Sequence, residues 1–229
     1  MSKLIYKVKN LCKTYENNGS SHKVLENLDF SLEKGKFTAI MGPSGVGKST
    51  LLNLLGMLDS PTGGNIFFND KDISCLNEKE KNRLRRKNIG FIFQFHHLIK
   101  ELNAAENAMI PLFLQGKNRK NALQAASSLL SELGLEGKEN KKPGNLSGGE
   151  RQRIAIARAV IHHPEVILGD EISGNLDTKT SVETIKLLKE IQKKYSLTMV
   201  IVTHDKLIAR EADITYQLQY GNISKEEVN

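Results

Sequence analysis

The stretch GPSGVGKST at residues 42–50 constrains the fold more than any other part of the chain. It places three glycines, a lysine and hydroxyl side chains between the apolar run FTAI and the helix-like LLNLLG. Glycine adopts backbone angles closed to other residues, so Gly42, Gly45 and Gly47 let the turn curl with its N–H groups pointing inward. A helix beginning near Lys48 adds its positive end to this anion-binding nest. The pattern predicts a phosphate-binding P-loop.

The side chains of this loop have separate expected roles. Lys48 supplies a full positive charge for the terminal phosphates of a nucleotide, and the Ser49 hydroxyl can ligate a magnesium ion. The other residues expected to hold the nucleotide are Gly42, Pro43, Ser44, Gly45, Val46, Gly47 and Thr50. The loop alone leaves open which kind of nucleotide-driven protein this is.

Length and composition set the bounds. The 229 residues, 39% of them hydrophobic, can bury one sizeable core with at most a smaller lobe attached. No apolar run approaches the roughly 20 residues that cross a bilayer, and no signal peptide is visible, so we expect a cytosolic chain. The net charge of +7 would suit nucleic acid, an anionic membrane or a nucleotide. The basic run at 79–87 lacks interleaved aromatics, which indicates a solvated helix face and no nucleic-acid partner.

Strand-like and helical runs alternate along the chain, which predicts an α/β core with extra antiparallel strands near the start. Strand signals vanish between Phe95 and Asn145, where residues 119–134 give a clear helix closed by Gly134. We therefore expect a single domain over residues 1–229. Its core lobe consists of residues 1–94 and 146–229, and a helical lobe at about 95–145 is inserted into it.

A second anion-binding helix end follows at LSGGERQRIAIARAVIHHP, where Ser147, Gly148 and Gly149 open a helix. One chain rarely needs two such ends for one triphosphate, because the P-loop already holds the phosphates from one side. We therefore infer that residues 147–149 serve the nucleotide of another subunit.

Two buried strand-like runs each end in polar side chains. EVILG is followed by Asp170 and Glu171, and MVIV is followed by Thr203 and His204. Adjacent carboxylates repel each other without a cation, so we expect Asp170 to hold magnesium, usually through water, while Glu171 polarises the attacking water. At the second strand exit, His204 is expected to contact the γ-phosphate.

On these motifs and their order, the chain resembles the ATP-binding-cassette (ABC) ATPases over essentially its whole length. The resemblance implies an ATPase that uses ATP and Mg²⁺, with Gln94 of the Q-loop as a catalytic and metal-contacting residue. It assigns the signature motif to LSGGE at 146–150 and the D-loop to GNLD at 174–177, with Asp177 at the nucleotide. Tyr15 matches the aromatic residue that stacks on adenine in that family.

The family resemblance also implies how the catalytic residues work together. Two chains pair head to tail as a homodimer, so that each ATP lies between one P-loop, including Lys48, and residues 147–149 of the other chain. Hydrolysis, with Glu171 as base and His204 steadying the γ-phosphate, then separates the pair and drives whatever is attached.

The segment after Gln94 indicates which group of ABC ATPases the chain resembles. FQFHHLIKELNAAENAMIPL resembles the ATPases of lipoprotein-releasing (Lol) systems. This resemblance implies a peripheral protein on the cytoplasmic face of the inner membrane of a Gram-negative bacterium, which powers release of lipoproteins toward a periplasmic carrier. Its integral membrane partners would be contacted through Phe95, His96, His97 and Leu98.

Two alternatives stay open at this point. The same wider group contains the ATPases of macrolide or peptide exporters. It also contains a cell-division cassette, in which ATP binding signals through a membrane partner to wall hydrolases and nothing is transported. A DNA-repair or translation factor is disfavoured, because those relatives carry long coiled-coil insertions or two cassettes in one chain.

Four residues depart from the family pattern. Ile172 and Ser173 replace the usual Pro-Thr, Gly169 stands where alanine is usual, and Lys100 where the releasing ATPases tend to have proline. A proline fixes the backbone and lacks an N–H, so Ile172 is expected to loosen the turn that aims Glu171 or leave an extra N–H to be satisfied. We expect an altered rate of hydrolysis, not lost activity.

Overall fold

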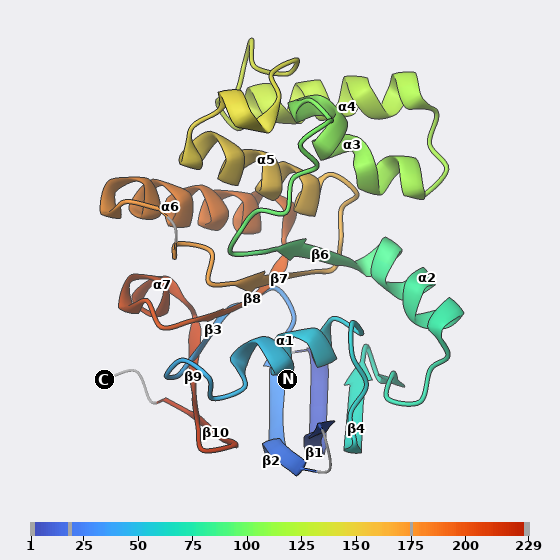
Figure 1. Cartoon of the computed structure of the whole chain (residues 1–229), viewed down its shortest axis with the longest axis vertical. Coiled ribbons are helices and arrows are strands. Elements are labelled where there is room, and N and C mark those ends of the chain that lie inside the picture. Colours follow the sequence, from blue (N-terminus) through green and yellow to red (C-terminus); the bar gives the residue numbers. More distant parts are fainter. Residues whose placement is uncertain (1–2, 18–19, 175, 227–229) are drawn as a thin grey trace.

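The structure is a computed structural model that describes residues 3–17, 20–174 and 176–226. A four-stranded sheet lies at the bottom of Figure 1, a six-stranded sheet crosses the middle, and helices α3, α4 and α5 lie above it. An α/β architecture with N-terminal antiparallel strands is therefore confirmed.

The four-stranded sheet is antiparallel and has the order β2-β1-β4-β5. Alternation of buried and exposed side chains, as at Leu28, Asp29 and Phe30, explains why these segments form strands with one face on the core. Its strands are β1 (Leu4–Asn17), β2 (Ser20–Glu33), β4 (Gly63–Phe68) and β5 (Lys71–Asp72).

The six-stranded sheet has the order β10-β9-β3-β8-β7-β6 and is parallel except for the β9–β10 hairpin. Its strands are β3 (Phe37–Met41), β6 (Ile89–Ile92), β7 (Val166–Asp170), β8 (Thr198–Thr203), β9 (Ile214–Gln219) and β10 (Asn222–Lys225). The apolar runs FTAI, IGFIF, VIL, TMVIV and ITYQLQY predicted β3, β6, β7, β8 and β9 of this sheet, whereas β10 was not predicted. The run ITYQLQY ends one residue early, because the chain turns at Tyr220 and Gly221 with positive φ and returns as β10.

This strand order positions the site. Because β3, β8 and β7 are parallel neighbours, their carboxyl ends meet at one edge of the sheet. The P-loop follows β3, Glu171 follows β7, and His204 follows β8. Residues from three distant parts of the sequence are thereby brought side by side.

Helix ends follow the expected capping chemistry. α4 ends before Gly134, whose φ of +75° suits glycine, and α2, α3 and α5 each begin with a reciprocal capping box. No helix in the described ranges is long and apolar enough to cross a bilayer. The helices are α1 (Lys48–Leu55), α2 (Glu78–Asn88), α3 (Ala104–Leu114), α4 (Arg119–Glu132), α5 (Gly148–Val160), α6 (Thr178–Tyr195) and α7 (Lys206–Glu211), with a 3₁₀ turn at Pro143–Asn145.

The core consists of two hydrophobic clusters on opposite faces of the six-stranded sheet. One joins the four-stranded sheet and α1 to residues such as Leu168 and Val202. The other runs without interruption from α3 and α4, through α5, to Met199 and Ile201. The helices within 95–145 thus share a core with the sheet, and the boundary of a separate helical lobe stays a prediction.

Candidate active site

The P-loop requires glycine at particular positions. Gly45 and Gly47 have φ values of +81° and +102°, in the left-handed region that favours glycine. A Cβ on Gly47 would lie 2.8 Å from a methyl group of Val24, and one on Gly42 would lie 2.4 Å from the carbonyl oxygen of Leu218. The expectation that Gly42 also adopts angles closed to other residues is wrong, because its φ is not positive. Glycine is required there because a side chain would clash with the Leu218 carbonyl.

Lys48 begins α1 and its side chain is buried at 6% exposure. Its ammonium group donates to the carbonyl oxygens of Gly42 (2.9 Å) and Pro43 (3.0 Å), within the loop itself. It also lies 3.5 Å from Oε1 of Glu171. The P-loop cation and the expected general base therefore share one cleft.

Glu171 is held by groups from the end of β8. His204 Nδ1 lies 2.9 Å from the carboxylate, and Oε2 accepts hydrogen bonds from the Thr203 hydroxyl (3.2 Å) and the His204 N–H (3.4 Å). A carboxylate only accepts, so the proton of this ring contact lies on Nδ1. Thr203, which the sequence analysis did not assign a role, thus helps His204 to fix the orientation of Glu171.

One cleft collects most of the residues predicted to act on the nucleotide. It is lined by Ser44, Gly45, Gly47, Lys48, Ser49, Thr50, Gln94, Glu171 and His204, together with Val24, which was not predicted. Pro43 and Val46 line a neighbouring hollow on the other side of the loop. The four residues expected to be catalytic therefore face the same space.

Asp170 lies just beneath this cleft. Its Oδ1 atom is buried without a hydrogen-bond partner among the described residues. Burial raises the pKa of this carboxyl group and the Glu171 charge raises it further, whereas a hydrogen bond with Ser49 lowers it. A buried carboxylate oxygen beside a hydroxyl group is a donor set that a hard cation would complete.

Tyr15 lies on β1, outside the lining of the cleft. Its side chain is 40% exposed, and its hydroxyl donates to Oδ2 of Asp59 at 2.8 Å. Burial and the hydrogen bond to Asp59 raise the pKa of the Tyr15 hydroxyl, whereas Thr50, which lines the cleft, partly opposes this rise. The ring is therefore adjacent to the P-loop with part of its surface open.

The signature segment forms a second cleft. Ser147 caps α5, accepting from the Glu150 N–H at 3.2 Å while Glu150 accepts from the Ser147 N–H at 2.8 Å. Asp177 caps α6 and lines the same cleft as residues 147–149. Within the expected D-loop, Asn175 lies outside the described residues.

One expectation about residues 96–98 needs correction, because His96, expected at the surface in contact with the membrane subunits, is buried. Leu98 packs partly buried against the core, and its contact with the membrane subunits stays a prediction. The backbone is left-handed at His96 and His97 (φ +60° and +48°), and Arg158 donates to their carbonyl oxygens at 2.5 and 2.7 Å. Burial, with the nearby Arg151 and Arg158 charges, lowers the pKa of His96, so its ring is neutral at neutral pH.

The departures around Glu171 fit each other. Ile172 is buried, and a Cβ added at Gly169 would lie 2.9 Å from its Cγ2 and 2.6 Å from Cδ1 of Ile201. Gly174 closes the turn by donating to the Glu171 carbonyl oxygen at 3.0 Å, and the Ser173 hydroxyl donates to Asp205 at 2.8 Å. These contacts hold the turn without the usual proline. An altered rate of hydrolysis stays a prediction.

Replacing Gly169 by alanine is expected to lower the free energy of unfolding by about 1–3 kcal/mol, because the added methyl overpacks this site. Adding Ile201→Val, which deletes the Cδ1 atom that the methyl meets, should recover part of the loss. Denaturant unfolding measures both, with Gly144→Ala as the control, since a Cβ there meets no atom within 4 Å. A Gly169→Ala protein as stable as the unchanged chain would show that the isoleucines yield freely.

A P-loop, an acidic pair and a histidine at neighbouring strand exits, and a signature helix in a second cleft define an ATP-binding cassette ATPase. Residues 25–174 match the family described as ABC transporter. The chain belongs to this ABC transporter family, and it is an ATP-binding ATPase.

Relatives with known names cover nearly the whole chain. It is 44% identical over 227 residues to the lipoprotein-releasing system ATP-binding protein LolD of Legionella pneumophila (strain Paris), covering 99% of this chain and 100% of that one. The LolD protein of Bacteroides thetaiotaomicron is 44% identical over 206 residues, covering 90% and 94%. A solved dimer of the ATP-binding cassette MJ0796, in a post-hydrolysis state bound to ADP and Pi, superposes with a TM-score of 0.90 at 37% identity, covering 98% and 99%.

Proposed function

We propose that this chain is the ATP-hydrolysing subunit of a complex that releases lipoproteins from the bacterial inner membrane toward a periplasmic carrier. The observation that carries this proposal is the similarity, along nearly the full length of both chains, to several proteins named LolD. The chain would act at the cytoplasmic face of that membrane, bound to integral subunits. Export of macrolides or peptides and regulation of cell division remain the competing functions.

The site fits a magnesium ion held by Ser49, Asp170 and Gln94. The supporting observation is the buried, unpartnered Oδ1 of Asp170, since Mg²⁺ prefers oxygen ligands and an orphaned buried oxygen is costly. When bound, the ion would neutralise charge on the phosphates.

The geometry supports a division of labour among the residues of the cleft. Lys48 and the P-loop N–H groups bind and orient the terminal phosphates. Glu171, oriented by His204 and Thr203, accepts a proton from the attacking water at its carboxylate. Gln94 lines the same cleft, where it can orient that water.

We propose that two copies of the chain share each ATP. Among the described residues, the P-loop cleft and the signature cleft have no lining residue in common, which supports a nucleotide that lies between the P-loop cleft of one chain and the signature cleft of another. The solved relative MJ0796 is itself a dimer. Residues 147–149 and Asp177 would then complete the site of the partner copy.

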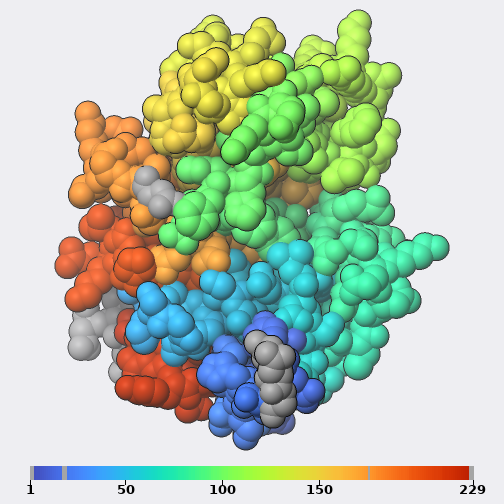
Figure 2. Space-filling model, viewed as in Figure 1, coloured from blue at the N-terminus to red at the C-terminus, as the bar shows by residue number. Residues whose placement is uncertain are grey.

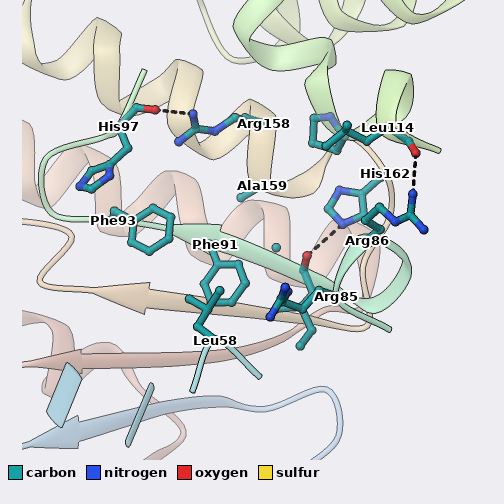
Figure 3. A pocket seen from close by; sticks show the side chains of 13 residues that line it. Leu58, Arg85, Arg86, Phe91, Phe93, His97, Leu114, Arg158, Ala159 and His162 are labelled. Carbon is teal, nitrogen blue, oxygen red and sulfur yellow. Dashed lines mark hydrogen bonds between the residues drawn. The ribbon is translucent and has the colours of Figure 1, made fainter. Parts of the chain in front are cut away.

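The proposed contact with membrane subunits centres on an apolar groove beside the Q-loop. We call it the docking groove, and Figure 3 shows Arg85, Arg86 and Arg158 around it. Its apolar lining includes Leu58, Phe91, Phe93, Pro111 and Leu114. Apolar walls with arginines at hand suit a short amphipathic helix that carries a carboxylate.

Phe95 and His97 connect this groove to the nucleotide site. His97 lines the groove, and its neighbour Phe95 is 68% exposed directly after Gln94. In Figure 2 the green segment that follows β6 lies on the visible surface, between the blue P-loop region and the upper helices. A change in the Q-loop on ATP binding would therefore reach the exposed Phe95 through one peptide bond, and the docking groove through His97, three residues after Gln94.

Phe95→Ala and Leu114→Asp are expected to leave the ATPase activity of the isolated chain nearly unchanged, yet to abolish lipoprotein release when the membrane subunits are present. Both side chains are more than half exposed, so their loss removes docking contacts and little core packing. Reconstituted vesicles and a pull-down of the membrane subunits measure the effect. Ala125→Asp, on the exposed face of α4 and outside the groove, is the control. Normal release by both variants would remove the docking assignment.

The function itself can be tested in the bacterium that carries the chain. Depleting the protein should leave lipoproteins in the inner-membrane fraction, and a Glu171→Gln copy should not restore their distribution. A normal lipoprotein distribution, with a defect in export or division instead, would favour one of the competing functions.

A further inference from the structure

The side chain of Tyr15 is held by two contacts, one at its hydroxyl and one at a face of its ring. Its hydroxyl donates to Oδ2 of Asp59 at 2.8 Å, and the ammonium group of Lys13 lies over the ring, 4.6 Å from its centroid. The side chain is nevertheless 40% exposed. A tyrosine held at its tip and covered on one face can offer its remaining open face as a fixed surface.

Asp59 is itself fixed by its neighbours. Its Oδ1 accepts from Lys13 Nζ and from the Ser60 N–H, both at 2.7 Å, and Lys13 also donates to the Ser60 carbonyl oxygen at 2.8 Å. Lys13 is only 7% exposed, so its ammonium group makes its hydrogen bonds largely with these partners. Burial opposes ionisation of Asp59, but the hydrogen bonds from Lys13 and Tyr15 outweigh it and lower the pKa of this carboxyl group.

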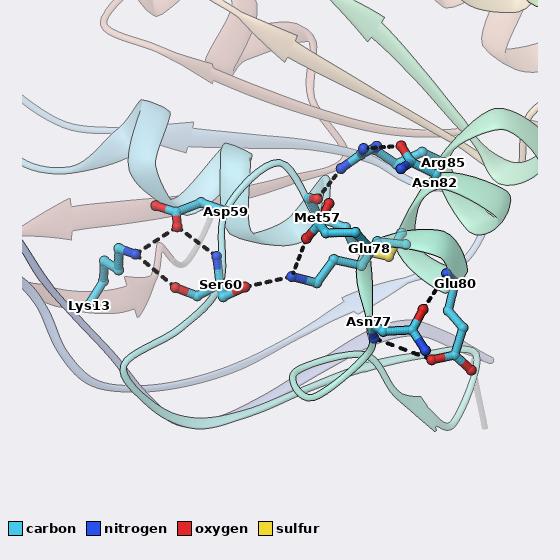
Figure 4. A network of polar contacts seen from close by, with 10 residues as sticks. Lys13, Met57, Asp59, Ser60, Asn77, Glu78, Glu80, Asn82 and Arg85 are labelled. Atoms are coloured by element: carbon cyan, nitrogen blue, oxygen red, sulfur yellow. Dashed lines mark hydrogen bonds and ion pairs between the residues drawn. The ribbon is translucent and has the colours of Figure 1, made fainter.

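The segment that carries Asp59 is also tied to α2 (Figure 4). The Ser60 hydroxyl accepts from Lys81 at 2.6 Å, and Lys81 in turn pairs with Glu78 at 3.1 Å. Arg85 donates to the carbonyl oxygen of Met57. Residues 57–60 are therefore held at both ends, and Asp59 cannot shift without breaking several polar contacts, most of them partly buried.

We propose that Asp59, held by Lys13, is a positioning residue for the nucleotide base: it fixes the Tyr15 ring in the orientation in which its open face stacks on adenine. This inference rests on the proposed ATP-hydrolysing function and on the family resemblance, which implies that Tyr15 stacks on adenine. An unrestrained tyrosine on a strand has several rotamers, and selecting one on binding costs affinity. The contacts of Tyr15 with Asp59 and Lys13 select one rotamer in the free protein, so this cost is not incurred when the base binds.

The test compares ATP with tripolyphosphate, which has no base, by calorimetric titration in the presence of magnesium. Asp59→Ala is expected to raise the Kd for ATP by about 3–10-fold and to leave that for tripolyphosphate within about twofold. Tyr15→Phe, which keeps the ring and loses only the hydroxyl, should show a similar loss. Combining the two should add little, because both break the same contact.

Matched variants give the comparison its meaning. Tyr15→Ala removes the aromatic ring and should raise the Kd for ATP by about 10-fold or more without changing the Kd for tripolyphosphate. Asp72→Ala removes a carboxylate that is likewise hydrogen-bonded, on β5 of the same sheet. It should change the Kd for neither ATP nor tripolyphosphate. If Asp59→Ala does not fold, Tyr15→Phe still tests the contact between the Tyr15 hydroxyl and Asp59, because it alters only a partly exposed side chain.

The outcomes separate the inference from its premise. If Tyr15→Ala leaves the affinity for ATP relative to that for tripolyphosphate unchanged, Tyr15 does not stack on the base, and the positioning role of Asp59 is overturned as well. If Tyr15→Ala lowers this relative affinity but Asp59→Ala and Tyr15→Phe do not, Tyr15 stacks on the base and the positioning role is overturned. Equal losses for ATP and tripolyphosphate in Asp59→Ala would assign Asp59 to the fold alone.

Discussion

Glu171→Gln is expected to slow ATP hydrolysis by about 10²–10⁴-fold, the usual cost of losing a general base. The replacement is nearly isosteric, and its amide oxygen can still accept from His204 and Thr203, so the turn and the P-loop should keep their shape. ATP binding should therefore persist. On a sizing column with ATP and magnesium, the variant should accumulate as a dimer, because the nucleotide that joins the two chains is not hydrolysed.

The matched control is Glu211→Gln, which removes a carboxylate paired with Lys189 outside the nucleotide cleft. It should hydrolyse ATP at the normal rate, because surface ion pairs contribute little. If Glu171→Gln also turns over at a near-normal rate, Glu171 is not the base.

The second large effect concerns the shared site. Lys48→Ala and Ser147→Arg should each abolish hydrolysis, the first by removing the P-loop cation and the second by placing a bulky charge at the α5 N-terminus. In a mixed dimer, one site carries both changes and the other carries neither. An equal mixture should therefore regain about a quarter of the normal activity, provided that one intact site suffices for turnover, since half of the dimers would be mixed.

ATPase assays across mixing ratios measure this recovery, which should be greatest near equal amounts. The ATPase activity of each variant assayed alone gives the baseline. Normal hydrolysis by Ser147→Arg alone would contradict the shared site, because the signature segment would then be dispensable.

The sequence was sufficient where a pattern is local. Apolar runs predicted the strands of the main sheet except β10, and the glycine spacing predicted the P-loop, whose Gly45 and Gly47 adopt left-handed angles as expected. The strand exits at Glu171 and His204 could also be read. Their mutual contact could not, because it depends on β7 and β8 being neighbours, and sheet order is set by packing of the whole domain.

Contacts between distant residues were beyond the sequence for the same reason. Asp59 reaches Tyr15 across 44 positions, and Arg158 reaches the carbonyl oxygen of His96 across 62. No spacing rule connects such pairs. A His-His dipeptide likewise does not signal the left-handed backbone at His96 and His97, nor that only the first of the two side chains is buried.

The central claim, that ATP hydrolysis by this chain drives lipoprotein release, is tested most directly in vesicles. The chain would be reconstituted with the membrane subunits that co-purify with it and a labelled lipoprotein, and the label recovered in the soluble fraction with a periplasmic carrier would be measured. Release is expected to require ATP and magnesium and to be lost with Glu171→Gln. Rapid ATP hydrolysis by the same complex with the lipoprotein still in the membrane would contradict the central claim.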